Sequence, residues 1–204
     1  MNSNNTVLMA LGALALYLWS KSSVGGKMAT SKILSFVTGS IGAARAAGAE
    51  YKLPVWLFLT AGAHESASGL SGLAIEANNF FGFTADDPKS NWRMAGKPTI
   101  QKPTHEWVAK PGVNDKVISG PDAKGLFYVS RTRYFRKYPS LLDSFRDYAR
   151  LLTTSARYAP AVAAAREGDV AGAFKALGTS GYATDPTYGE KLAGVYKSVK
   201  EYSV

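Results

Sequence analysis

The sequence predicts a mainly α-helical domain with a small β lobe, an α+β fold, preceded by an N-terminal hydrophobic helix. Apolar residues recur at helical spacing through most of the chain past residue 31. Between about residues 91 and 137 this periodicity fails, and prolines, glycines and short β-prone pieces take its place. With 204 residues, of which 46% are hydrophobic, the chain can build one domain with a substantial core plus an appendage.

The appendage is the N-terminal segment, residues 1–22. It contains an apolar run, Val7 to Trp19, with no charged residue before Lys21. The run is shorter than the roughly 20 residues of a membrane-spanning helix, although its uncharged flank can lengthen it. A cleaved signal peptide is the alternative, but no lysine or arginine precedes the run and no small-residue cleavage site directly follows it. We expect an uncleaved membrane anchor at residues 7–19, followed by a flexible linker at residues 23–30.

Helices are expected through most of the domain that we assign to residues 31–204. The first covers residues 31–53, and Pro54 suits the first turn of the second. Beyond the β lobe, Ser140 and Asp143 have the spacing of an N-terminal capping box, with aspartate in place of glutamate. The helices expected after the β lobe are residues 140–152, 160–167, 170–177 and 185–202.

The composition excludes several kinds of site. The chain has no cysteine, which excludes a thiol nucleophile, a disulfide and any cysteine-ligated metal. With only His64 and His105 as histidines, carboxylates would have to supply most ligands of a metal ion, so we expect no metal and no other cofactor. The net charge of +9 implies affinity for polyanions such as nucleic acid, anionic lipid or the bacterial wall. Because no nucleic-acid-binding motif accompanies the scattered basic residues, we expect no specific nucleic-acid partner.

The stretch "LPVWLFLTAGAHESASG", Leu53 to Gly69, contains a candidate general acid, Glu65. At the C-terminus of an apolar helix, both the helix dipole and the apolar neighbours disfavour the charged form and raise the pKa of a carboxyl group. Cleavage of a glycosidic bond needs a carboxylic acid that is still protonated near neutral pH. The alternative interpretation is a glutamate satisfied by backbone groups or by an arginine.

Three further stretches carry candidate residues. In "EANNFFGF", residues 76–83, amides beside aromatic rings suit sugar binding, although asparagine and glycine also suit a turn. Glu106 lies in "THEW" within the β lobe, where a surface glutamate on an edge strand is the simpler interpretation. Residues 184–186 are a good helix start, but that role does not explain the flanking Tyr182 and Tyr188.

In order and approximate spacing, these stretches resemble the flagellar-type peptidoglycan β-N-acetylglucosaminidases, glycoside hydrolase family 73. The resemblance covers about residues 36–199. It implies a lysozyme-like, mainly α fold with a small β lobe, and cleavage of the β-1,4 bond in the glycan strands of bacterial peptidoglycan. The segments that carry it are "AHES" at 63–66, "NNFFGF" at 78–83, "THEW" at 104–107, "FRKYPSLLDSFRDYARLL" at 135–152, "RY" at 157–158 and "YATDPTYGEKL" at 182–192.

Carried over residue by residue, the resemblance implies that Glu65 is the general acid. Glu106 matches the acidic residue of the β lobe that assists as a base or stabilises the oxocarbenium ion. Tyr182 matches a tyrosine of the groove, which we place among the catalytic residues. The residues expected to bind the glycan are Asn78, Asn79, Phe80 and Gly82, which match the segment lining the glycan site, and Tyr188.

The sequence departs from the family pattern in two places. The tryptophan that often follows the catalytic "ES" is missing, since the sequence reads "ESASG". The stretch 110–134 looks longer than the usual β lobe, which affects the assignment of Glu106. Rival functions are a lytic transglycosylase or a muramidase on the same substrate, and a non-catalytic wall-binding or virion structural protein.

We expect the protein to act on the bacterial cell wall while attached to a membrane. We expect peptidoglycan glycan strands as the partner, contacted from the extracytoplasmic side by a protein that residues 7–19 anchor in a membrane. The short chain, the apparent anchor and the absence of wall-binding repeats favour a bacteriophage or virion protein, with virion or envelope proteins as further partners.

Overall fold

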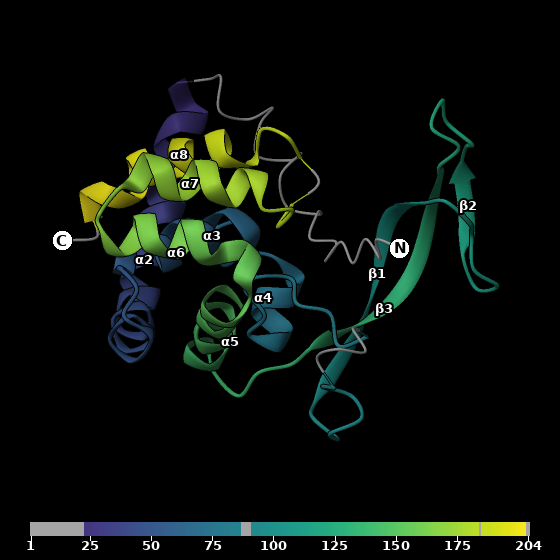
Figure 1. Cartoon of the computed structure of the whole chain (residues 1–204), viewed down its shortest axis with the longest axis horizontal. Coiled ribbons are helices and arrows are strands. Elements are labelled where there is room, and N and C mark those ends of the chain that lie inside the picture. The colour runs from purple at the N-terminus through teal and green to yellow at the C-terminus, as the bar shows by residue number, and fades with distance from the viewer. Residues whose placement is uncertain (1–22, 87–90, 184, 203–204) are drawn as a thin grey trace. The chain divides into compact units, whose positions relative to one another are not determined.

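The computed structural model describes residues 23–86, 91–183 and 185–202 (Figure 1). These residues form two compact units, a helical unit that ends at Gly82 and resumes at Tyr138, and a sheet unit, Phe83–Lys137. The predicted architecture, mainly helical with a small β lobe, is confirmed. The helices are α2 (Ser23–Tyr51), α3 (Val55–Glu65), α4 (Gly72–Ala77), α5 (Leu141–Thr154), α6 (Ala159–Arg166), α7 (Val170–Thr179) and α8 (Tyr188–Val199), with short 3₁₀ turns η2 (Ala156–Tyr158) and η3 (Lys200–Tyr202).

Helix α3 is the core helix of the helical unit. Every residue from Leu57 to His64 is buried, as expected of a helix that is apolar on all sides. Helices α2 and α8 both pack against it. A Cβ atom at Gly62 would lie 3.1 Å from the Phe36 ring and 3.5 Å from the Phe145 ring, so the missing side chain lets both aromatic rings close on the helix.

Helix α5 confirms the helix expected at residues 140–152. The Ser140 hydroxyl accepts a hydrogen bond from the Asp143 backbone N–H, so Ser140 is the N-cap. The Asp143 carboxylate accepts the Ser140 hydroxyl proton at 2.7 Å. The buried face of α5 contributes Phe145 and Tyr148 to an aromatic core in which Tyr148 stacks on Phe81 at 4.1 Å between ring centroids.

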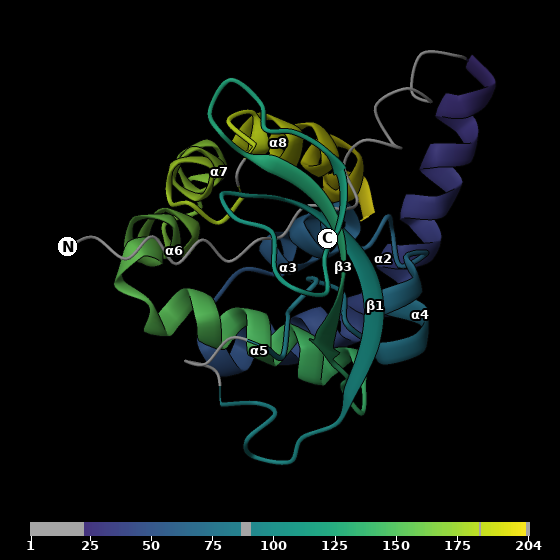
Figure 2. The ribbon, with the colours of Figure 1, turned by 90° about the vertical axis from the view of Figure 1, so that its right-hand side faces the viewer.

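The sheet unit is a three-stranded antiparallel sheet with the strand order β1-β3-β2. Its strands are β1 (Thr99–Val108), β2 (Lys116–Ser119) and β3 (Phe127–Arg136), and Figure 2 shows β1 and β3 as a long curved pair. Both strands of this pair are 10 residues long, longer than the short β-prone pieces that the sequence suggested. Pro103 does not interrupt β1, because β1 is an edge strand and needs no backbone N–H at every position.

The N-terminal predictions have two outcomes. The linker expected at residues 23–30 is wrong, because α2 already begins at Ser23. Glycines at 25 and 26 cost about 1 kcal/mol each relative to alanine, which weakens a helix without ending it. The anchor expected at residues 7–19, in the segment 1–22, lies outside the described residues. Within the described ranges, none of the helices has both the length and the apolar character needed to cross a membrane.

Candidate active site

Glu65 is the last residue of α3, immediately before a tight turn. Ala67 and Ser68 have φ of 52° and 57°, and Gly69 has φ of 81°, so the chain reverses direction through left-handed conformations. The Ser66 hydroxyl braces this turn by donating to the Gly62 carbonyl and accepting from the Gly69 N–H at 2.8 Å. The small residues of "SASG" therefore serve a turn that leaves the Glu65 side chain at the end of the core helix.

The Glu65 carboxyl accepts a hydrogen bond from Tyr188, the first residue of α8. The Tyr188 hydroxyl donates to Glu65 Oε1 at 2.7 Å. Burial raises the pKa of Glu65 to about 7, and the Tyr188 hydrogen bond opposes part of that rise. The raised pKa predicted from the apolar context is confirmed, and at neutral pH a large fraction of Glu65 is a neutral acid.

Three buried tyrosines surround this carboxyl. Tyr182 stacks on Tyr188 with 5.4 Å between ring centroids, and Tyr148 meets Tyr182 edge-on at 6.0 Å. Burial raises the pKa of all three well above 10, and a charge on Glu65 raises it further. Among the described residues, the hydroxyls of Tyr148 and Tyr182 have no hydrogen-bond partner. Two unpaired buried hydroxyls near Glu65 are costly for stability, which is typical of groups retained for a ligand or for bound water.

His64 lies beside the same site but is not a proton donor near neutral pH. It is buried, and its ring meets the Tyr188 ring edge-on at 5.5 Å. Burial, together with the positive charge of Lys191, lowers the pKa of His64 to about 4, while Asp185 opposes this shift. Lys191 itself forms an ion pair with Asp185.

The helix start expected at residues 184–186 lies partly within the described residues. Asp185 accepts hydrogen bonds from the Thr187 N–H at 2.8 Å and the Thr187 hydroxyl at 2.7 Å. Helix α8 begins at Tyr188, just after this turn, while residue 184 lies outside the described residues. The turn orients the first residue of α8, Tyr188, whose hydroxyl reaches Glu65.

The segment expected to bind glycan mostly makes internal contacts. Asn78 ends α4 in a left-handed conformation, and its side-chain amide donates to the carbonyls of Tyr138 and Pro139 at 3.1 and 3.3 Å. Asn79 is buried, and the Phe80 ring packs 6.1 Å from Phe36 and 6.2 Å from Phe145. Gly82 has φ of 66° with open space where a Cβ would lie, so its conformation explains the glycine. Glycan binding by Asn78, Asn79, Phe80, Gly82 and Tyr188 stays a prediction.

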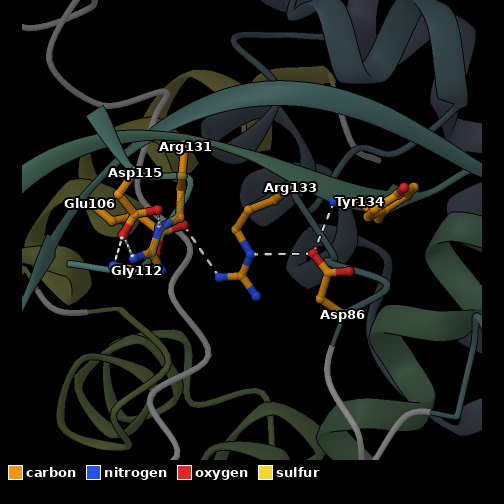
Figure 3. A network of polar contacts seen from close by, with 7 residues as sticks. All are labelled: Asp86, Glu106, Gly112, Asp115, Arg131, Arg133 and Tyr134. Carbon is orange, nitrogen blue, oxygen red and sulfur yellow. Dashed lines mark hydrogen bonds and ion pairs between the residues drawn. The ribbon is translucent and has the colours of Figure 1, made fainter. Parts of the chain in front are cut away.

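Glu106 lies in the sheet unit and is buried rather than a surface glutamate. It is 6% exposed, although β1 is an edge strand. Arg131 and Arg133, two residues apart on β3, each reach a Glu106 oxygen at 3.3 Å. Figure 3 shows this network, in which Arg131 also pairs with Asp115 and Arg133 lies between Glu106 and Asp86. The carboxylate is therefore ion-paired on both oxygens.

Arg131 and Arg133 were not predicted from the sequence as partners of Glu106. Both arginines belong to the stretch "RTRYFRK", residues 131–137. In a strand, residues at i and i+2 share a face, so a strand over this stretch would have predicted Arg131 and Arg133 side by side. The pairing of Glu106 with Val129 places the glutamate on that same face.

An open pocket of about 550 Å³ lies in the sheet unit next to this network. Its lining is polar and charged, and includes Asp86, Asp115, Arg131, Arg133 and Tyr134. No cluster of three or more histidine, aspartate or glutamate side chains with the arrangement of a metal site occurs among the residues that the structure describes.

The chain matches a family model and several known proteins. A model of the glucosaminidase family, described as mannosyl-glycoprotein endo-β-N-acetylglucosaminidase, matches residues 41–201. The peptidoglycan hydrolase FlgJ of Vibrio parahaemolyticus is 38% identical over 72 residues, which cover 35% of this chain and 23% of FlgJ. The exo-glucosaminidase LytG of Bacillus subtilis is 31% identical over 136 residues, which cover 64% of this chain and 39% of LytG. The matched part of this chain thus spans well under half the length of either relative.

Solved structures agree in fold. A C-terminally truncated glycoside hydrolase domain of FlgJ from Salmonella typhimurium has a TM-score of 0.59 and 27% identity, covering 84% of this chain and 99% of that domain. The catalytic domain of the autolysin Auto from Listeria monocytogenes has a TM-score of 0.62 at 22% identity, covering 83% of this chain and 85% of that domain, and shows the shared fold alone. The chain belongs to the glucosaminidase family, and its resemblance to glycoside hydrolase family 73 is confirmed.

Proposed function

We propose that this chain is a peptidoglycan hydrolase, an endo-β-N-acetylglucosaminidase that cleaves β-1,4 glycosidic bonds in the glycan strands of the bacterial cell wall. The observation that carries the proposal is the Glu65 carboxyl, held by Tyr188 at 2.7 Å with a pKa of about 7. Family membership supplies the reaction class, and the relative FlgJ is named a peptidoglycan hydrolase.

In the proposed reaction Glu65 acts as the general acid. Its proton passes to the glycosidic oxygen, the bond from that oxygen to the anomeric carbon breaks, and an oxocarbenium-like centre develops on the sugar ring. With a pKa of about 7, Glu65 can carry a proton near neutral pH and still release it readily, as an acid catalyst must. Water adds to the anomeric carbon and completes hydrolysis, and the Glu65 carboxylate regains a proton.

Tyr182 is the second catalytic residue that we propose in the helical unit, after Glu65. Its buried hydroxyl has no partner among the described residues and lies close enough to Glu65 for the two to interact electrostatically. A hydroxyl without a protein partner is free to bind the substrate or the attacking water. We propose that Tyr182 contacts the reacting sugar, and that Tyr188 acts as a positioning residue for Glu65.

Glu106 is the proposed second carboxylate. Both of its oxygens contact guanidinium groups, an arrangement that holds the carboxylate in a fixed position. The same arginines already neutralise much of its charge, so less of that charge is left to stabilise a cationic centre. We therefore expect Glu106→Gln to lower activity less than Glu65→Gln does.

A side-by-side assay tests these roles. The full chain, Glu65→Gln and Glu106→Gln are compared for clearance of a peptidoglycan suspension. Loss of one general acid should reduce the rate by about 10²-fold or more, with folding checked by circular dichroism. Equal rates for the chain and Glu65→Gln would refute the proposed acid.

The cellular setting is a separate proposal. A wall substrate implies action on the extracytoplasmic side, and we propose that residues 7–19 hold the protein at a membrane there, either of the cell or of a virion that breaches the wall. Flotation of the full chain with lipid vesicles, compared with a chain that starts at Lys27, tests the anchor. Flotation of both forms, or of neither, would contradict it.

A further inference from the structure

The face of the sheet opposite Glu106 carries three aromatic side chains that no catalytic role uses. Side chains alternate along a strand, so His105 and Trp107 of β1 point away from the face that holds Glu106. Trp107 pairs in register with Tyr128 of β3. We call His105, Trp107 and Tyr128 the ring platform.

The three rings of the platform contact one another in a row. Tyr128 lies between the other two, with centroid distances of 5.7 Å to His105 and 5.2 Å to Trp107. The His105 and Tyr128 planes differ by 26°, and the Tyr128 and Trp107 planes by 35°. Mutual stacking fixes the rings before any ligand arrives, so little side-chain entropy remains to be lost on binding.

The platform is open to solvent. Trp107 is 47% exposed, which is unusual for so large an apolar side chain. The neighbouring positions in register on this face are polar, with Ser130 opposite both His105 and Lys116, and Ser119 opposite Tyr128. Flat rings bordered by hydroxyl and ammonium groups suit a ligand that is apolar on its faces and polar at its edges, as a pyranose ring is.

The charge of the sheet unit fits a wall polymer. Residues 83–137 contain 11 lysines and arginines against five aspartates and glutamates. Peptidoglycan carries carboxylates in its peptide stems, so a basic lobe is attracted to it. A single-stranded nucleic acid would also meet rings and positive charge here, but family membership favours the glycan.

We propose that the ring platform, on the sheet face opposite Glu106, is a glycan-binding site on which a peptidoglycan strand lies with a pyranose face against the exposed Trp107. The inference rests on the proposed substrate class but needs no turnover. Such a site would hold the enzyme on an insoluble wall while one bond after another is cleaved, as expected of two linked contacts on one polymer.

The test measures binding in the absence of hydrolysis. The full chain carrying Glu65→Gln is sedimented with purified peptidoglycan sacculi, alone and with Trp107→Leu, Trp107→Phe or Met94→Ala added. We expect Trp107→Leu to weaken binding about tenfold, and Trp107→Phe to keep most of it because a ring remains. Met94, which is 87% exposed in the same unit, is the matched apolar control and should leave binding within about twofold.

Three outcomes would overturn the proposal. One is unchanged binding by Trp107→Leu, and another is equal loss in Trp107→Phe, which would indicate damage to the lobe rather than loss of stacking. The third is displacement by a single-stranded oligonucleotide but not by a soluble β-1,4 N-acetylglucosamine oligomer. The proposed hydrolase activity fails separately, if the unmodified chain releases no fragments from the same sacculi.

Discussion

Replacing Tyr188 with phenylalanine removes one hydrogen bond from the candidate acid and leaves its aromatic contacts in place. The lost bond is the one from the Tyr188 hydroxyl to Glu65 Oε1, 2.7 Å long. A hydroxyl that donates to a carboxylate stabilises the charged form, so its removal raises the pKa of Glu65 above the present value of about 7. Hydrogen bonds to charged groups contribute about 1.5–3 kcal/mol, and each pH unit corresponds to about 1.4 kcal/mol.

The expected effect is a displaced pH profile. Because Glu65 must be protonated to act, activity in the unmodified chain falls as the pH rises through about 7. We take the lower end of the range, since Glu65 is partly exposed, and expect this alkaline limb to move up by about one pH unit in Tyr188→Phe. The maximal rate should also fall, because the carboxyl loses the contact that orients it.

The assay is the pH dependence of kcat/KM on solubilised glycan strands. Tyr196→Phe is the matched control, since Tyr196 also lies on α8 and its ring contacts Trp56 and Phe174. Its alkaline limb should stay at about pH 7. A limb that stays in place in Tyr188→Phe, or moves to lower pH, would refute the account of how Glu65 is held.

Three other substitutions test the site and its support. Glu65→Gln should stabilise the protein by about 3 kcal/mol at pH 8 and by much less at pH 4. The pKa of Glu65 rises from 4.5 to about 7 on folding, so the ionisable carboxyl destabilises the folded protein as the pH increases between those values. Urea denaturation at the two pH values measures the difference. Tyr182→Phe should lower kcat more than about tenfold without lowering Tm, since its buried hydroxyl lacks a partner among the described residues. Gly62→Ala should cost about 1–3 kcal/mol in the free energy of unfolding, because the added Cβ meets Phe36 at 3.1 Å.

Each of these has a contradicting result. A Glu65→Gln variant that is no more stable than the parent at pH 8 would show that burial does not disfavour the ionised carboxyl. A Tyr182→Phe variant with full kcat would remove Tyr182 from the reaction. Unchanged stability of Gly62→Ala, with Gly42→Ala as a control at an open helix position, would show that the rings have room to shift.

The local features of this site were predictable from sequence, whereas its partners were not. The apolar helix ending at Glu65, the raised pKa of that residue and the Ser140 cap all follow from residues within a few positions of one another. The Tyr188 hydrogen bond joins residues 123 positions apart, and only the folded chain brings them together. Likewise, Glu106 seemed a surface residue because its arginine partners lie 25 and 27 residues away, on the neighbouring strand.

Backbone context explains the remaining differences. Pro103 suggested an irregular stretch, but an edge strand tolerates it. The glycines near residue 25 suggested a linker, yet they lie within the first turn of α2. In both cases the surrounding secondary structure outweighed the backbone preference of the proline or glycine.

Identification of the fragments released from peptidoglycan tests the central claim most directly. Purified sacculi are digested with the full chain and with Glu65→Gln, and the new sugar ends are reduced and identified by mass spectrometry. We predict reducing N-acetylglucosamine ends from the unmodified chain and none from Glu65→Gln. Reducing muramic acid ends would indicate a muramidase, and anhydro-muramic ends a lytic transglycosylase. The absence of any fragment from folded protein between pH 5 and 8 would contradict the proposed enzyme.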